Sequence, residues 1–398
     1  LRLSEEAVIA EAGMMQWDNK GQLPLMITAS CDFAPYDQPQ LSPIGFDALM
    51  KNSKGVVGIV AASRLVFAYS NKQLNDLFIQ DLLVPDSMGN FKRIGDALRQ
   101  AKNNYWAMVP DRVNAFKFSL LGDPAMQLTA PKYQVQVKTI NTKQLIGADT
   151  LMAGGIYKLT GAITGKDQIK TDYNGVVELV LYDAVKNIST LANLTTSMSV
   201  PIPVQENILF KGKATVSNGI FSIDFILPKE SVGTKGALKM QLYASSVSGD
   251  AIGVFNNIYV SNKLEAILSD TIGPIINSFI NDTNFVNGTW VTGNAKLLIH
   301  LNDNAGIQIS GNALGHDLVM IVDGDYKRPI ILNTYYTAAV NTYQRGTVVY
   351  SLPLFTEGKH ELIIKAWDLF GNSSTDTLVF VVPPTEKLML RKFSISPN

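Results

Sequence analysis

Cysteine and histidine are scarce in this sequence. Its 398 residues include one cysteine, Cys31, and three histidines, His300, His316 and His360. A single cysteine excludes an internal disulfide and a cluster of thiolate metal ligands. So few histidines give zinc chemistry no support either. We therefore expect no metal or other cofactor.

An excess of charge of one sign is also missing, as is a long apolar run. Lys and Arg together number 34, Asp and Glu also number 34, and the formal net charge is zero. Nucleic-acid binders carry a basic patch, so we expect no nucleic acid among the partners. A helix that spans a membrane needs about 18 or more apolar residues in a row. The sequence has no such run and no signal peptide, and because it begins at Leu1 we expect it to be part of a larger protein.

The first 130 residues differ from the rest in their periodicity. Residues 23–29 and 55–62 are apolar runs typical of strands buried on both faces of a parallel sheet. Three amphipathic helices are predicted with them. They lie between Ser42 (the N-cap, followed by Pro43) and Gly55, at residues 71–83 with Asn71 as N-cap, and at residues 94–105. The alternation of strand and helix predicts an α/β domain over residues 1–130.

From Tyr133 onward the sequence follows a period of two, which predicts β-strands. The strands are predicted at residues 133–139, 176–182, 220–226, 238–244, 254–260, 296–301, 318–322, 347–352, 360–366 and 377–382. The Gly-Pro break in DTIGP (residues 270–274) divides them into two β-sandwich domains, 131–268 and an Ig-like 269–384. We expect residues 385–398 to be a linker into a further C-terminal domain.

Cys31 follows directly after the first predicted strand. In a parallel α/β sheet, ligands bind at the carboxyl ends of the strands, where loops carry function. A thiol held there close to helix N-termini meets the conditions for a nucleophilic thiolate. A solitary cysteine can equally be a buried, inert small hydrophobe. Position alone leaves both interpretations open.

Several segments, taken in order, resemble the gingipain-type cysteine peptidases. In the first part they are LPLMITASCDFAPYDQP (23–39), the second apolar run with Arg64-Leu65-Val66 after it, and FSLLGDP (118–124). In the second part they are DNAGIQISGNALGH (303–316), ILNTYY (331–336) and KAWDLFGNS (365–373). No single motif is very specific, and it is their order and spacing that carry the resemblance.

The resemblance implies a caspase-like fold for residues 1–130 and a catalytic role for Cys31 as the nucleophile. The family's catalytic histidine comes from a Gly-His-Gly type segment, which is expected upstream of Leu1. Asp32 would order the loop or hold a substrate group. Ser63 and Arg64 stand at the end of the second strand, where caspase-like folds build a substrate pocket.

Within this family the chain is most similar to the sortase of the Bacteroidetes type IX secretion system. The implied reaction removes C-terminal sorting domains from exported proteins and links the cargo to a lipopolysaccharide. The implied partners are those exported proteins, other outer-membrane components of the secretion system and the lipopolysaccharide acceptor. The implied location is the bacterial cell surface, secreted and associated with the outer membrane. Two alternatives stay open: a secreted endopeptidase, and a non-catalytic scaffold or adhesin.

Asp303, Asp323 and Asp325 lie in loops of the second part that are rich in Asp, Asn and Gly. Oxygen ligands of this kind can bind calcium, but the spacing matches no known loop signature. We interpret these residues as solvated turns.

Overall fold

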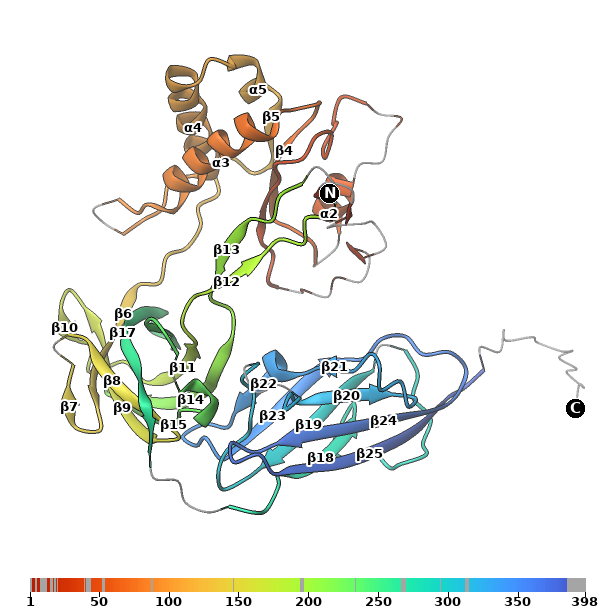
Figure 1. Ribbon diagram of the computed structural model, residues 1–398. Helices are drawn as coiled ribbons and strands as arrows, with labels where there is room; N and C mark the ends of the chain where they lie inside the picture. Colours follow the sequence, from red (N-terminus) through yellow and green to blue (C-terminus); the bar gives the residue numbers. More distant parts are fainter. Residues whose placement is uncertain are drawn as a thin grey trace, which may run out of the picture. The chain divides into compact units, whose positions relative to one another are not determined.

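The chain forms two compact units, Leu1–Ala130 (unit 1) and Pro131–Asn398 (unit 2). Figure 1 shows a computed structural model of the protein. The residues that the structure describes are 2–3, 6–7, 13–14, 17, 19, 21–38, 40, 44–51, 54–86, 89–145, 147–193, 197–232, 234–265, 270–293, 295–311 and 315–384. No helix among these residues is both long enough and apolar enough to cross a membrane.

Unit 1 is built around a three-stranded sheet in the order β3-β4-β5. Strand β4 pairs in parallel with β3 and antiparallel with β5. The strands are β3 (Leu25–Ile27), β4 (Gly58–Ala62) and β5 (Phe118–Gly122), and a separate pair is formed by β1 (Arg2–Leu3) and β2 (Glu6–Ala7). The helices are α2 (Ile44–Met50), α3 (Ala68–Leu83), α4 (Ile94–Met108) and α5 (Arg112–Phe116).

Helices cover both faces of this sheet (Figure 1). Val60 and Ala62 of β4 belong to one hydrophobic cluster with residues of α3 and α4. Ile59 and Ala61 belong to another, together with Ala48 of α2. Alternate residues of a strand point to opposite faces, so every residue of β4 is buried. This is the two-sided burial predicted for the second apolar run, whereas the residues of β3, in the first run, are only half-buried.

The predicted start of α3 is wrong. The helix begins at Ala68, and its N-cap residue is Phe67, which makes no side-chain capping bond. Asn71 therefore lies within the first turn, where its side chain is buried. The expected cap of α2 at Ser42 and Pro43 lies outside the described residues.

The first part of unit 2 is one continuous ten-stranded sheet. Its strands are β6 (Tyr133–Ile140), β7 (Lys143–Gln144), β8 (Asp149–Ala153), β9 (Ile156–Gly165), β10 (Gln168–Ile169), β11 (Gly175–Tyr182), β14 (Ile208–Ser217), β15 (Ile220–Ile226), β16 (Leu238–Ser245) and β17 (Ala251–Leu264). The sequence predicts a sandwich of two sheets here. Instead the path β9-β15-β14-β11-β16-β17-β6 returns to β9, because β6 pairs with both β17 and β9.

The closing contact between β17 and β6 requires a glycine. A Cβ atom on Gly253 would lie only 2.1 Å from the carbonyl oxygen of Val135. The two backbones can approach this closely only because Gly253 has no side chain. The closed ring of strands depends on this close contact between β17 and β6. It replaces the two separate sheets that the sequence predicts.

A hairpin and a short helix accompany this sheet. Strands β12 (Lys186–Ser189) and β13 (Pro201–Val204) pair only with each other, and η1 spans Lys229–Ser231. The buried carboxylate of Asp183 lies at the base of the hairpin, where it accepts hydrogen bonds from the N–H of Ala184 and the hydroxyl of Thr234.

The second part of unit 2 consists of two four-stranded antiparallel sheets, β18-β19-β23-β22 and β21-β20-β24-β25. Their strands are β18 (Ile275–Ile280), β19 (Lys296–Asn302), β20 (Val319–Val322), β21 (Ile330–Ile331), β22 (Tyr336–Ala338), β23 (Arg345–Ser351), β24 (Gly358–Trp367) and β25 (Ser373–Val382), with η2 at Asn333–Tyr335. Buried residues of both sheets share one core, for example Leu297 of β19 and Leu362 of β24. Two sheets packed over a common core form a sandwich.

Candidate active site

The segment around Cys31 is fixed to strand β4 on both sides. The N–H of Thr28 donates to the carbonyl of Val60 at 2.9 Å, and the N–H of Ala34 donates to the carbonyl of Ala62 at 3.2 Å. Cys31 lies between these two anchors, in the turn that follows β3. Because β3 and β4 are parallel, the thiol lies at the carboxyl end of the sheet, as the sequence predicts.

The sulfur of Cys31 contacts the backbone of Val66. Sγ lies 3.3 Å from the carbonyl oxygen of Val66 and accepts a hydrogen bond from the N–H of Val66 at 3.4 Å. The half-buried side chain also packs against the core on the α3 side of the sheet. Helix α3 begins two residues later, at Ala68. The sulfur thus has one acceptor and one donor within hydrogen-bonding distance, both from the backbone of Val66.

Buried amides hold the loop before Cys31. Asn71 of α3 donates its Nδ2 hydrogen to the carbonyl of Ala29 at 3.1 Å, while its Oδ1 accepts from Nδ2 of Asn114 at 2.9 Å. Oδ1 of Asn114 accepts in turn from the N–H of Phe67 at 3.1 Å. Asn71 and Asn114 are each only 1% exposed. This amide network joins the loop before Cys31 to α3 and α5.

Asp32 adopts a left-handed backbone conformation, with φ of 46°. Aspartate tolerates this region better than most residues, but the conformation still costs free energy and needs support from its surroundings. Here the support is the pair of anchors to β4 on either side. Asp32 therefore has a clear role in shaping the turn that presents Cys31.

Ser63 and Arg64 occupy different environments at the end of β4. Ser63 is buried, and its hydroxyl donates to the carbonyl of Lys117 at 3.3 Å. Arg64 is partly exposed and forms an ion pair with Asp37, with Nη1 2.6 Å from Oδ1. This pairing lowers the pKa of Asp37 and raises the pKa of Arg64. Arg64 thus reaches solvent, while Ser63 holds the strand end.

Unit 1 contains no histidine, because all three lie in unit 2. His300 is an exposed residue of β19, and His316 stacks on Trp367 with ring centroids 4.1 Å apart. His360 is buried, with Nδ1 2.8 Å from Oδ2 of Asp323 and Nε2 2.7 Å from the carbonyl oxygen of Thr356. Packing and cross-strand contacts account for these side chains.

The model of peptidase family C25 matches residues 2–129, which include Cys31 and its supporting loops. We call this stretch the C25 segment, because it is similar to that family over its whole length. The C25 segment coincides with unit 1 almost residue for residue.

Solved structures similar to the chain include dimeric latent PorU from Porphyromonas gingivalis, with 26% identity over 85% of this chain and a TM-score of 0.40. The chain covers 32% of the length of that PorU chain. A complex of the pro- and mature domains of Porphyromonas gingivalis RgpB shows 15% identity over 63% of this chain and 49% of that chain, with a TM-score of 0.28. Among curated proteins no match is found.

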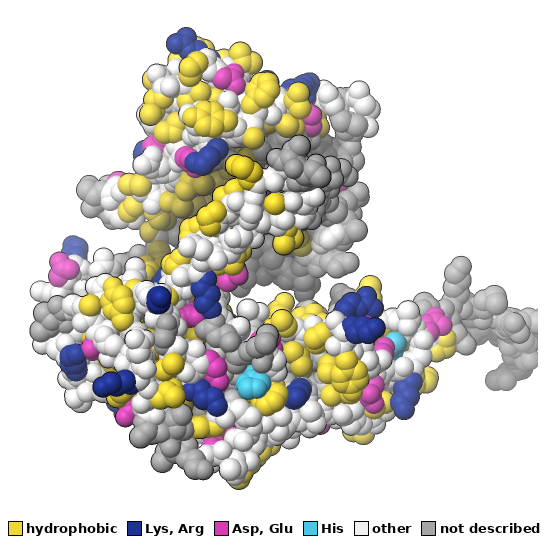
Figure 2. Space-filling model, in the orientation of Figure 1, with side chains coloured by type: hydrophobic (Ala, Val, Ile, Leu, Met, Phe, Trp, Pro, Cys, Tyr) yellow, Lys and Arg dark blue, Asp and Glu magenta, His cyan; other side chains and the backbone are white. Residues whose placement is uncertain are grey.

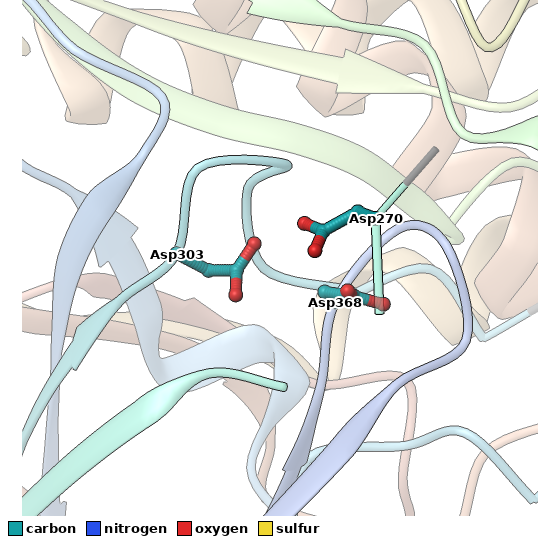
Figure 3. A group of neighbouring side chains, drawn as sticks. All are labelled: Asp270, Asp303 and Asp368. Atoms are coloured by element: carbon teal, nitrogen blue, oxygen red, sulfur yellow. The ribbon is translucent and has the colours of Figure 1, made fainter. Parts of the chain in front are cut away.

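A group of carboxylates converges in the second part of unit 2. Oxygen atoms of Asp270, Asp303 and Asp368 lie within 4.8 Å of one another, and Figure 3 shows the three side chains turned toward a common point. Burial raises the pKa of Asp303 to about 6, and the charges of Asp368 and Asp270 contribute. Among the described residues, this is the group whose oxygens could hold a cation.

The interpretation of Asp303 as a solvated turn residue is wrong, because its side chain is buried. Asp323 binds His360, and Asp325 forms an ion pair with Arg328 at 2.8 Å. The true neighbours, Asp270 and Asp368, are far away in sequence and meet Asp303 only through the folding of the sandwich. The sequence also misses the amide network below Cys31, because Asn71 at a helix start resembles an N-cap.

Proposed function

We propose that the full-length protein is a cysteine peptidase in which Cys31 is the nucleophile. The observation that carries this proposal is the position of Cys31 within the C25 segment, at the carboxyl end of β3, with its sulfur against the Val66 N–H. A second point supports it. Among the described residues, no hydrogen bond occupies the N–H of Cys31, so this group is free to bind an oxyanion.

In the proposed reaction the Cys31 thiolate attacks the carbonyl carbon of a substrate peptide bond. The tetrahedral intermediate places its negative oxygen at the Cys31 N–H. Collapse breaks the C–N bond and leaves a thioester on Cys31, while the departing amine takes up a proton. The resemblance assigns this proton transfer to a histidine upstream of Leu1. A second nucleophile then cleaves the thioester and restores the thiol.

The more specific proposal is that the second nucleophile is an amine, which makes the protein a sortase. The cargo would be exported proteins with C-terminal sorting domains, and the acceptor a lipopolysaccharide at the outer surface of the cell, together with other components of the type IX secretion system. In this proposal residues 1–130 are the last part of a caspase-like domain, and the sandwich of unit 2 is an Ig-like support. Arg64, with its ion pair to Asp37, would border the substrate site.

The test replaces Cys31 with alanine in the full-length protein. Cys31→Ala is expected to abolish removal of C-terminal signals from exported cargo, while the circular dichroism spectrum stays unchanged. The neighbouring Ser30→Ala is the matched control and should process cargo normally. Normal processing and anchoring in the Cys31→Ala strain would contradict the proposal and favour a scaffold.

Mass spectrometry of the released cargo separates the two possible nucleophiles. A sortase leaves an amine-linked C-terminus, whereas an endopeptidase leaves a free carboxylate. If all released cargo ends in a free carboxylate and its release requires Cys31, the protein is a peptidase and the sortase proposal is wrong.

A further inference from the structure

A groove of about 650 Å³ runs along unit 1 between α4, α5 and strand β5. Its walls include Trp106 of α4 and Phe116 of α5, whose rings meet edge to face with centroids 5.1 Å apart. Trp106 is 42% exposed and Phe116 is 63% exposed. Figure 2 shows hydrophobic side chains gathered over this helical end of unit 1. The groove does not include Cys31, Asp32 or Arg64.

The floor of the groove is the edge of a sheet. Strand β5 is the last strand in the order β3-β4-β5. In an antiparallel pair, the N–H and C=O groups of alternate residues face the partner strand. The N–H of Ser63 donates to the carbonyl of Lys117 at 2.9 Å, in register with the β4–β5 pairing. The backbone N–H and C=O groups of Lys117, Ser119 and Leu121 therefore point toward β4.

The backbone N–H and C=O groups of the intervening residues of β5 point away from β4. Lys102 confirms this, because its Nζ reaches the carbonyl of Phe118 from α4 at 2.6 Å. The next two residues with this orientation are Leu120 and Gly122, and both line the groove. Among the described residues, no hydrogen bond engages their outward N–H and C=O groups. An unpaired strand edge of this kind is a template for another extended chain.

The charges of the groove have one sign. Its lining includes Arg99 and Lys102 and no acidic residue. Lys102 is partly buried, and its amine donates a hydrogen bond to a backbone carbonyl rather than to a carboxylate. Burial lowers the pKa of this amine, and a nearby anion would stabilise its charged form. Arg99 is exposed and pairs only at 3.4 Å with Asp96.

We propose that this groove binds an extended polypeptide segment, which adds as a strand to the free edge of β5. The bound segment pairs its backbone with Leu120 and Gly122, places apolar side chains against Trp106 and Phe116, and sets a carboxylate near Lys102. The carboxylate is the side chain of an Asp or Glu residue of the segment. This site is separate from the thiol and does not depend on the reaction of Cys31.

The experiment starts from a displayed library of random decapeptides selected on the 398-residue chain. The selected sequences are expected to contain an acidic residue and apolar residues at alternate positions. A selected peptide is then synthesised with a fluorescein label, and its binding is measured by fluorescence anisotropy. An amidated copy should bind equally well, because the carboxylate comes from a side chain and not from the C-terminus.

Variants of the chain test the walls of the groove. Lys102→Gln and Phe116→Ala are each expected to weaken binding at least about tenfold. Lys72→Gln is the matched control, because Lys72 is an exposed lysine of α3 paired with Asp76, and it should leave the affinity unchanged. Equal binding to the Lys102→Gln, Phe116→Ala and unaltered chains would overturn the proposal, as would a selection that enriches no peptide.

Backbone methylation tests the strand pairing itself. Two peptides are N-methylated, one at odd and one at even positions. Pairing with β5 predicts that one of them loses binding and the other keeps it, because only alternate N–H groups face the edge. Amide exchange followed by NMR should slow at Leu120 and Gly122 on binding. Equal effects of both methylation patterns would show a site for amphiphilic anions instead and would overturn strand addition.

Discussion

The polar side chains buried in unit 1 are neutral, whereas those buried in unit 2 include three carboxylates and an imidazole. Among the described residues, the unit 1 set is Thr28, Ser63, Ser70, Asn71 and Asn114, and the ionisable members of the unit 2 set are Asp183, Asp303, His360 and Asp368. Hydroxyls and amides keep their hydrogen-bonding roles over a wide pH range, whereas a carboxylate or an imidazole changes its role when it gains or loses a proton.

Because of this difference, the buried hydrogen bonds of the two units should respond differently to pH. The amide network of unit 1 lies directly below the loop that carries Cys31. In the proposed reaction the thiol gains and loses a proton, and the neutral side chains below it would keep their hydrogen bonds while it does so. Unit 2 uses carboxylates to tie its turns, so its stability should respond to pH. Three substitutions, in order of decreasing expected effect, test this difference between the units.

The largest effect is expected for Asn71→Ala in unit 1. The substitution leaves the carbonyl of Ala29 and the amide of Asn114 without their partner in a buried site. We expect a loss of about 2–4 kcal/mol in the free energy of unfolding of unit 1. The measurement is urea unfolding followed at 222 nm, because the α-helices of the described residues lie in unit 1.

Asn75→Ala, one turn further along α3, is the control for this prediction and should change the free energy of unfolding by less than about 0.5 kcal/mol. The loss caused by Asn71→Ala should also be the same at pH 5 and pH 8. A strongly pH-dependent loss would contradict the neutral character of this network.

A smaller effect is expected for Asp303→Asn in unit 2. The folded-state pKa of Asp303 is raised from 3.8 to about 6. A raised pKa favours the protonated form, so the contribution of Asp303 to stability is present below pH 3.8 and is lost as the pH rises through about 6. The variant should match the natural chain near pH 4 and exceed it by up to about 3 kcal/mol at pH 7.5.

The measurement for Asp303 is the free energy of unfolding of unit 2 from pH 4 to pH 7.5, with a chelator present because a divalent cation would stabilise the ionised carboxylates. Asparagine can still accept the hydrogen bond from the N–H of Ala305, so the turn is retained. Parallel pH curves for the two proteins would show that Asp303 titrates normally.

The smallest effect is expected for Asp323→Asn. Burial alone lowers the pKa of His360, but hydrogen bonds to Asp323 and to the carbonyl of Thr356 outweigh it, and the net pKa is raised. The charged imidazole therefore contributes stability below pH 6.5, and this contribution is lost as the pH rises through the folded-state pKa. The variant should lose less than about 1 kcal/mol at pH 5.5, because Asp323 is half exposed, and less still at pH 8.5.

The control in the same loop is Asp325→Asn, which removes an exposed ion pair with Arg328. Its effect on stability should be equal at the two pH values. If Asp325→Asn and Asp323→Asn show the same pH dependence, His360 is not the group that titrates.

Much of the secondary structure can be predicted because it depends on local periodicity. The strands predicted at residues 176–182 and 238–244 appear as β11 and β16 with shifts of one residue at the most. The ring closure of β6 with β9 and β17 cannot be predicted this way. It joins strands far apart in sequence and depends on the absence of a side chain at Gly253.

The position of Cys31 after an apolar strand can be predicted from the sequence, because an apolar run and its end are local features. The surroundings of the thiol depend on the tertiary structure. The backbone of Val66 lies 35 residues away, Asn71 turned from an expected cap into a buried support, and the free edge of β5 became visible only once its pairing with β4 was known. Each of these features depends on contacts between segments that are far apart in the sequence. Such contacts are set by the packing of the whole unit and not by a local sequence pattern.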